Sequence, residues 1–148
     1  MSERDVFWAE RAAYLRTNAW LAAGAMAAGM AILWAMGNPH VWTGAVGGLA
    51  AIAIRAWYAA SEELALDWRL TATHLEGPSR RPLEDGAAAA PSWRVALPDI
   101  AQVRTMGGFV QIVTVSGDKH LMKYLADPNS VAARIDGARS AARQTAAA

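Results

Sequence analysis

The feature that most constrains this chain is a long stretch without charged side chains. Residues 18–53 contain no Asp, Glu, Lys or Arg, and two apolar runs, 19–36 and 41–60, account for most of the region. Each run approaches the ~20 residues that a helix needs to cross a hydrocarbon core of about 30 Å. The GNPH sequence at 37–40 favours a tight turn between them. The sequence therefore predicts an antiparallel transmembrane hairpin over residues 18–60.

Aromatic and basic side chains mark the ends of both apolar runs. The two tryptophans of each run are separated by about 21–23 Å along a helix, the spacing of two interfacial belts. Arg55 lies about one turn inside its helix end, from which it can snorkel to the headgroups. The predicted membrane-interface residues are Trp20, Trp34, Trp42, Arg55, Trp57 and Tyr58.

The basic residues also predict an orientation. The turn at 37–40 has neither Lys nor Arg, whereas basic residues flank the outer ends of the hairpin: Arg4, Arg11, Arg16, Arg55 and Arg69. Because positive loops stay in the cytoplasm, we expect a multi-pass protein of the inner membrane with both termini cytoplasmic.

Small residues recur along both predicted spans. Every fourth residue of the first span is alanine, and a Gly-x-x-x-Gly motif opens the second. Small side chains let membrane helices approach closely, so these faces either pack on each other within the hairpin or meet a helix of another subunit, in a hetero-complex or a homo-oligomer. The predicted helix-packing residues are Ala19, Ala23, Ala27, Ala31, Gly44, Gly47, Gly48 and Ala51.

The first 17 residues read as a further helix. Ser2 is placed as its N-cap, and Glu3 and Asp5 would lie in the first turn, where negative charge is favourable. Such a helix either lies in the cytoplasmic interface or simply extends the first span.

From residue 61 the pattern changes to that of a β domain. Alternating apolar and polar side chains predict strands at 64–73, 74–76, 93–97, 100–105, 109–115 and 120–125. Ser116-Gly117-Asp118-Lys119 joins the last two as a hairpin turn. We expect the strand at 74–76 to stop at Gly77-Pro78.

A helix is predicted to end the domain, which we expect over residues 61–143. Asp127 is placed as the N-cap and Pro128 at the first helical position. Val131 and Ile135 then mark the side that covers the sheet. The tail at 144–148 is expected to fray.

The segment 77–92 is rich in Pro, Gly and Ala and has no period, which predicts a loop. Its Arg80 and Arg81 are candidate lipid contacts, each worth about 1 kcal/mol near anionic headgroups. Glu84 and Asp85 follow at once and cancel that charge locally.

The order of these elements resembles the bacterial pleckstrin-homology (PH) domain of small membrane proteins. The resemblance covers roughly residues 64–137 and rests on three short motifs, whose matching positions are Trp68, Leu70 and Thr71; Leu97, Asp99 and Ile100; and Asp127, Pro128, Val131, Ala132 and Ile135. It implies a partly open antiparallel β-barrel with a C-terminal capping helix and no shared catalytic residues. Some relatives assist the assembly of membrane complexes, including photosynthetic ones.

The composition narrows the function further. The chain has no cysteine and a net charge of +1, which exclude thiolate chemistry and a global attraction to nucleic acid. His40, His74 and His120 have no partner at ligand spacing, so we expect no metal, no cofactor and no catalytic set. We therefore expect a non-catalytic accessory or assembly subunit of a larger membrane complex, respiratory or photosynthetic. The alternative is a membrane-anchored sensor that binds lipid or peptide.

Overall fold

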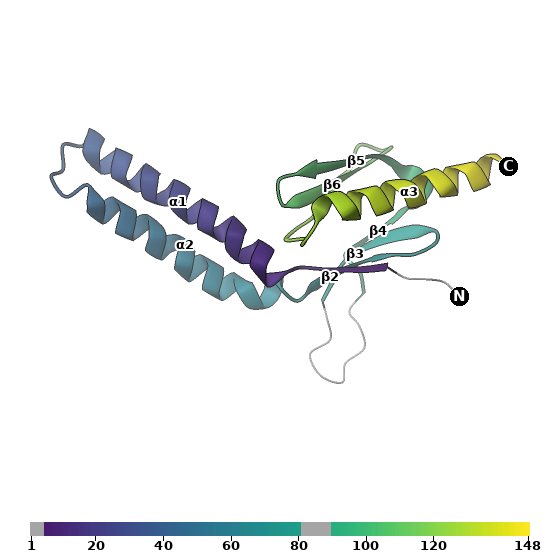
Figure 1. The fold of residues 1–148 in the computed structure, drawn as a ribbon, viewed down its shortest axis with the longest axis horizontal. Helices are drawn as coiled ribbons and strands as arrows, with labels where there is room; N and C mark the ends of the chain where they lie inside the picture. The colour runs from purple at the N-terminus through teal and green to yellow at the C-terminus, as the bar shows by residue number, and fades with distance from the viewer. Residues whose placement is uncertain (1–4, 81–89) are drawn as a thin grey trace.

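The computed structural model describes residues 5–80 and 90–148, and Figure 1 shows that they form two parts. A helical hairpin extends to one side, and a β domain with the C-terminal helix lies at its open end. The described elements follow the order strand, two long helices, six strands and a final helix. This is the α+β arrangement that the sequence predicted.

Helices α1 (Arg11–Ala35) and α2 (Trp42–Glu63) form the hairpin and pack along their length. Both reach beyond the predicted region of 18–60, because the segments that flank the apolar runs are also rich in alanine and other helix formers. Gly37 begins the connecting turn with a φ of 70°, a conformation that glycine adopts without strain. The predicted turn is therefore confirmed.

The prediction of a helix over the first 17 residues is wrong for its first part. Asp5–Trp8 forms strand β1, in which Phe7 is buried opposite Trp68 of the next strand. Val, Phe and Trp favour strands where a sheet edge is at hand, and β1 finds that edge only in the folded domain. The remaining part extends α1 back to Arg11, while the proposed N-cap, Ser2, lies outside the described residues.

Within the described residues, α1 alone is long and apolar enough to be a candidate membrane span. Helix α2 has a suitable length but falls short in hydropathy, because Arg55 and three glycines lie within it. The two-span anchor therefore stays a prediction.

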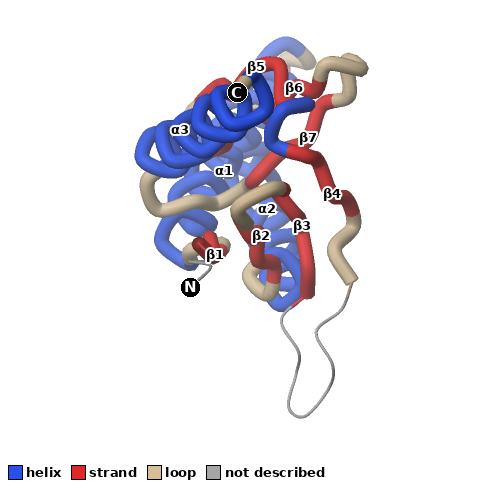
Figure 2. The backbone as a smooth tube through the Cα atoms, turned by 90° about the vertical axis from the view of Figure 1, so that its right-hand side faces the viewer, coloured by secondary structure: helices blue, strands red, loops and turns tan. Residues whose placement is uncertain are grey.

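The strands form two antiparallel sheets, ordered β1-β2-β3-β4 and β5-β6-β7. A short 3-10 turn, η1 (Leu97–Asp99), follows β4 at the predicted stop and leads from one sheet to the other (Figure 2). The strand bounds are Leu66–Leu70 for β2, His74–Arg80 for β3, Trp93–Ala96 for β4, Ile100–Met106 for β5, Phe109–Thr114 for β6 and Lys119–Met122 for β7.

Strand β3 differs from its prediction because it continues through Gly77 and Pro78. The pairing of β2 with β3 shifts register near this point, and a proline is tolerated where the ladder is interrupted. The predicted β6–β7 hairpin is confirmed. Its turn is closed by Thr114, whose Oγ1 accepts a hydrogen bond of 3.0 Å from the backbone N–H of Asp118.

Helix α3 (Pro128–Ala147) begins as predicted, because the Asp127 side chain accepts a hydrogen bond of 3.1 Å from the backbone N–H of Ser130. It packs on η1, β5 and β6. Arg143 donates to the carbonyl oxygen of Ile100 at 2.8 Å, which satisfies part of the exposed edge of β5. The predicted frayed tail is wrong, since Ala, Arg and Gln carry the helix on to residue 147.

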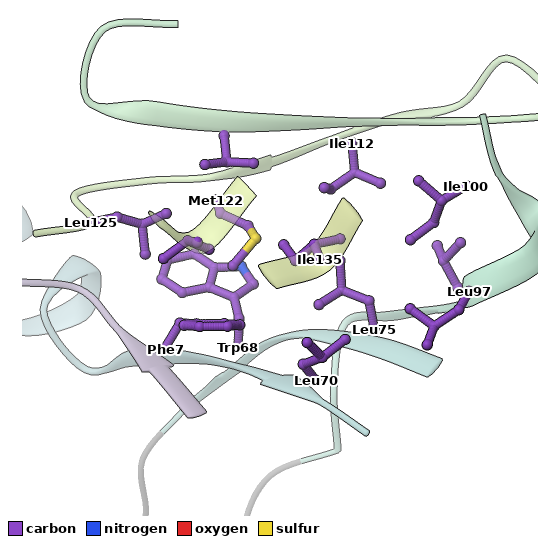
Figure 3. Close-up of a cluster of buried hydrophobic side chains, with 13 residues drawn as sticks. Phe7, Trp68, Leu70, Leu75, Leu97, Ile100, Ile112, Met122, Leu125 and Ile135 are labelled. Carbon is purple, nitrogen blue, oxygen red and sulfur yellow. The ribbon is translucent and has the colours of Figure 1, made fainter. Parts of the chain in front are cut away.

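The hydrophobic core lies between the two sheets and α3, as Figure 3 shows. Trp68 is its largest side chain, and its ring lies against Gly77 so closely that no Cβ would fit at that position. The core residues are Phe7, Trp68, Leu70, Leu75, Val95, Leu97, Ile100, Val110, Ile112, Met122, Leu125, Val131 and Ile135.

Candidate interaction site on the helical hairpin

The two helices of the hairpin meet backbone to backbone. Gly44 faces the backbone of Gly29, and Gly48 faces that of Ala25, so closely that a Cβ on either α2 glycine would overlap main-chain atoms. Two members of the predicted packing set, Gly44 and Gly48, therefore do pack within the hairpin. This close approach is what small residues allow in membrane helices.

The other predicted packing residues do not take part in this contact. Gly47 faces open space and Ala51 is exposed. The alanines at every fourth position of α1 are exposed as well, so the first of the two alternatives, packing within the hairpin, does not apply to this face. We call it the alanine ladder: Ala19, Ala23, Ala27 and Ala31.

Helix geometry explains why the ladder points away. Residues four apart are offset by about 40° around a helix, so a strict four-residue repeat drifts off any one contact. The residues of α1 that face α2 alternate steps of four and three, which cancels this drift. They are Asn18, Ala22, Ala25 and Gly29, of which the first two are buried.

The predicted interface aromatics all point outward. Trp20, Trp34 and Trp42 are 76%, 76% and 64% exposed, and Trp57 and Tyr58 are 82% and 78% exposed. Arg55 is also exposed. Exposed apolar surface on this scale is typical of a site that meets a membrane or a partner. Their placement in membrane interfaces stays a prediction.

A polar and aromatic junction joins the hairpin to the domain, and no motif in the sequence predicts it. The hydroxyl of Tyr14 donates to the carbonyl oxygen of Ala56 across the hairpin at 2.7 Å. The Tyr14 and Tyr124 rings meet edge to face with centroids 4.9 Å apart, and the Phe109 ring also meets Tyr124 edge to face at 6.0 Å. These contacts fix the base of the hairpin to the domain.

Tyr124 is held tightly in this junction. Its φ is 58°, an uncommon conformation for a residue with a side chain, and its carbonyl oxygen accepts a 2.7 Å hydrogen bond from the backbone N–H of Glu10. Burial raises the pKa of the Tyr124 phenol well above its usual value, and the hydrogen bond to Glu63 and the charge of Glu63 raise it further. The phenol therefore remains a neutral donor at physiological pH.

A groove of about 530 Å³ lies between α1 and α2 next to this junction, and we call it the basal groove. Small and apolar side chains form most of its walls, with Arg11 at one end: Leu15, Ala19, Ala22, Leu49, Ile52, Ala53, Ala56, Trp57 and Ala60.

Asn18 lies in the wall of the basal groove, which Arg11 and Tyr14 also line. Asn18 is only 6% exposed, and its Nδ2 donates to the carbonyl oxygen of Tyr14 at 2.9 Å. Its Oδ1 is buried and accepts no hydrogen bond from any described residue. An unsatisfied buried acceptor costs about 1–3 kcal/mol, so Asn18 marks this groove as a place where a donor would be stabilised.

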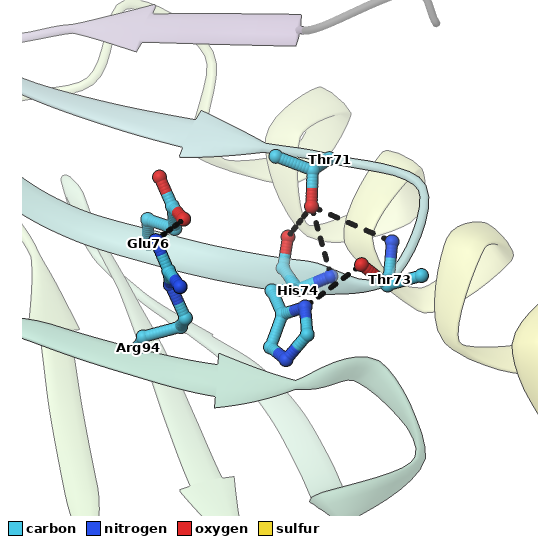
Figure 4. Close-up of polar contacts among 5 residues, drawn as sticks. All are labelled: Thr71, Thr73, His74, Glu76 and Arg94. Atoms are coloured by element: carbon cyan, nitrogen blue, oxygen red, sulfur yellow. Dashed lines mark hydrogen bonds and ion pairs between the residues drawn. The ribbon is translucent and has the colours of Figure 1, made fainter.

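Two groups of polar residues in the domain take part in structural contacts. Figure 4 shows His74 at the β2–β3 turn, where its Nδ1 lies 2.7 Å from the Thr73 hydroxyl and its backbone N–H donates to Thr71 Oγ1. Glu76 forms an ion pair with Arg94 at 2.6 Å. These contacts hold the turn and the β3–β4 pair.

The remaining candidate residues are separate from one another. His40 lies in the hairpin turn, and His120 stacks on Trp93 with ring centroids 4.4 Å apart. Across residues 5–80 and 90–148, no three His, Asp or Glu side chains gather as a metal site would require. Arg80 ends β3, and Arg81 lies outside the described residues, so lipid contact there stays a prediction.

No protein-family model and no curated protein matches this sequence. The resemblance to bacterial PH domains is therefore an interpretation of its motifs and of the arrangement of its strands and helix.

Proposed function

We propose that this protein is a non-catalytic inner-membrane subunit that assists the assembly of a larger membrane complex by binding another membrane helix through its hairpin. The observation that carries this proposal is the exposed alanine ladder of α1. It is a surface of close approach that the hairpin does not use for its own packing.

The physics of a bilayer favours this reading. Between membrane helices there is no hydrophobic drive, so association depends on close packing of small side chains and on hydrogen bonds. The alanine ladder offers small side chains for close packing along α1, and Asn18 beside it offers a hydrogen-bond acceptor. A helix used only as an anchor needs neither.

The β domain fits the same role. We propose that it is a PH-like module on the cytoplasmic side, fixed to the hairpin by the Tyr14–Tyr124 contact. A rigid junction keeps the domain in one position over the membrane helices, which an assembly factor needs if both parts contact one partner. The arginine-free turn at 37–40 is the basis for placing both termini in the cytoplasm.

Purification of the full-length protein in a gentle detergent tests the proposal. A C-terminal tag should recover a complex, and Ala27→Leu should weaken it because a larger side chain separates the helices. Ala28→Leu is the matched control, since Ala28 is also exposed but points about 100° away around the helix. Recovery of a lone monomer, or equal loss with both variants, would contradict the proposal.

A membrane-anchored adaptor that binds peptide or lipid is the second candidate. It is favoured by a surface hollow of about 410 Å³ beside the edge strand β4, lined by both apolar and polar residues, among them Trp93, Arg94 and His120. An unpaired strand edge can accept an extended peptide. Salt-sensitive binding of the full-length protein to anionic vesicles would favour the lipid form of this function.

A further inference from the structure

The lining of the basal groove indicates the chemistry of its occupant. Its walls are mostly apolar, with five alanines among their residues and Arg11 at one end, so they favour an occupant that is mainly apolar and slender enough to approach a backbone. Asn18 Oδ1 is buried beside the groove and accepts no hydrogen bond from a described residue. The terminal torsion of an asparagine is broad, so the amide can turn this oxygen toward a donor that enters the groove, in exchange for the Nδ2 hydrogen bond to Tyr14.

The register of the hairpin shows which donors lie at the depth of Asn18. Gly29 faces Gly44 and Ala25 faces Gly48, so the two helices advance together, residue for residue, in opposite directions. Carried toward the domain, this register puts Asn18 between the levels of Trp20 and Trp57, about 3 Å from each along the helix axis. Both indoles are exposed.

A second copy of this chain presents the same indoles at the same depth, because all copies enter the membrane with one orientation. Indole suits the groove, since it has an apolar body and a single N–H donor with no acceptor. Trp20 is better placed than Trp57, because Trp20, Ala23 and Ala27 share one face of α1. One helix therefore offers both the donor and the small residues.

We propose that the basal groove is a self-association site, in which α1 of a second copy lies along the groove with its alanine ladder at the contact and its Trp20 indole N–H donates to Asn18 Oδ1. Ala19 belongs to both the ladder and the groove wall. Groove and ladder are therefore adjacent on α1, and two copies can bind reciprocally around a two-fold axis. This inference rests on the proposed function, because it names the helix that the ladder meets.

Disulfide trapping tests the contact directly, because the chain has no cysteine of its own. Two differently tagged full-length forms, Ala23→Cys on the ladder and Ala53→Cys in the groove, are co-expressed and oxidised in native membranes. A disulfide forms only when the Cα atoms come within about 7 Å, so this pair should give a cross-linked dimer. Ala28→Cys paired with Ala53→Cys is the matched control and should not. Equal cross-linking in both pairs, or none in the first, overturns the proposal.

The hydrogen bond has its own test, for which exposed residues are chosen so that folding is unaffected. Energy transfer between labelled full-length copies in lipid vesicles gives the dissociation constant of the dimer. Trp20→Phe removes the donor and should raise this constant about three- to twenty-fold, the range of hydrogen bonds between membrane helices. Trp34→Phe, equally exposed at the far end of α1, should leave it unchanged. Equal constants for Trp20→Phe and wild type would overturn the assignment of the donor.

The two proposals fail in different ways. A monomer that still holds another membrane protein through the ladder would overturn self-association and leave helix docking intact. A monomer that holds a co-purified lipid, with no protein partner, would overturn both. A dimer that shows the Ala23–Ala53 disulfide and responds to Trp20→Phe supports self-association and helix docking through the ladder.

Discussion

The hairpin and the β domain of this protein use their large side chains in opposite ways. In the domain Trp68 is buried, and the sheets close around it. In the hairpin the helices meet through glycine and alanine backbones, while Trp20, Trp34 and Trp57 point outward. The domain is therefore stabilised by removing apolar surface from water, whereas the hairpin leaves its large apolar side chains exposed, as we expect of helices in a membrane.

The difference teaches where each part obtains its stability. The domain contains its own hydrophobic core, so its stability should depend on the volume of buried side chains. The hairpin has almost no core, and its stability should depend on how closely two backbones approach. Removing a large side chain should therefore destabilise the domain more than the hairpin, and adding a methyl group at the helix contact should destabilise the hairpin.

The largest expected difference is between two tryptophans. Trp68→Ala should destabilise the domain by about 3–5 kcal/mol, because it leaves a cavity among the core residues. Trp57→Ala should change the free energy of unfolding of the domain very little, since its side chain is exposed on α2. Denaturant unfolding of the full-length protein in mild detergent, followed by near-UV circular dichroism, measures both. Similar losses of unfolding free energy in the two variants would contradict this difference between the domain and the hairpin.

Substitutions at two glycines of α2 should distinguish the effect of close helix packing on stability from the effect of helix propensity. Gly44→Ala should destabilise the hairpin by about 1–3 kcal/mol, because the new methyl group meets the backbone of Gly29. Gly47→Ala faces open space and should be neutral or stabilising by up to about 1 kcal/mol. Titration of the full-length protein with SDS in mixed micelles compares them. Effects of the same sign would show that the helices do not meet at Gly44.

The junction between the two parts should weaken at high pH. Burial raises the folded-state pKa of Tyr124 above the unfolded value of about 10. Its contribution to stability is therefore complete below pH 10 and is lost as the pH rises above it. Tyr124 should contribute about 1.4 kcal/mol per pH unit to the slope, and Tyr124→Phe should lower the slope by this amount. Unfolding measured from pH 8 to 11 tests this, and an unchanged slope in the variant would place the titrating group elsewhere.

The smallest expected effect concerns the start of α3. Asp127→Ala removes the side-chain acceptor of the Ser130 N–H and should cost about 1 kcal/mol. Asn129→Ala, an exposed position in the same turn, serves as the control. Thermal unfolding of the domain signal should distinguish them, and equal melting temperatures would show that this cap contributes nothing.

Local signals predicted much of the fold. The turn at 37–40, the β6–β7 hairpin and the Asp127-Pro128 start of α3 were all predictable, because each depends on residues next to one another in the chain. Strand β1 was not, because its partner β2 lies about 60 residues further on. A short segment ending in Val-Phe-Trp becomes a strand only where the rest of the sheet supplies an edge.

The candidate site was predicted less well than the fold. The sequence pointed to small residues on both helices, but it could not tell which of them face each other. Gly44 and Gly48 are at the helix contact, whereas the alanine ladder is exposed, and Asn18 had no signal at all. The direction of a helix face depends on how two helices cross, which is a property of the folded pair rather than of either repeat.

We propose that the hairpin crosses the membrane and leaves its turn on the periplasmic side. Single-cysteine variants of the full-length protein test it in intact bacterial cells, with a maleimide that cannot cross the inner membrane. Asn38→Cys in the turn should react in intact cells, whereas Ser116→Cys in the β6–β7 turn should react only after lysis. Protection of Asn38→Cys until lysis, with labelling of both cysteines thereafter, would contradict the two-span account.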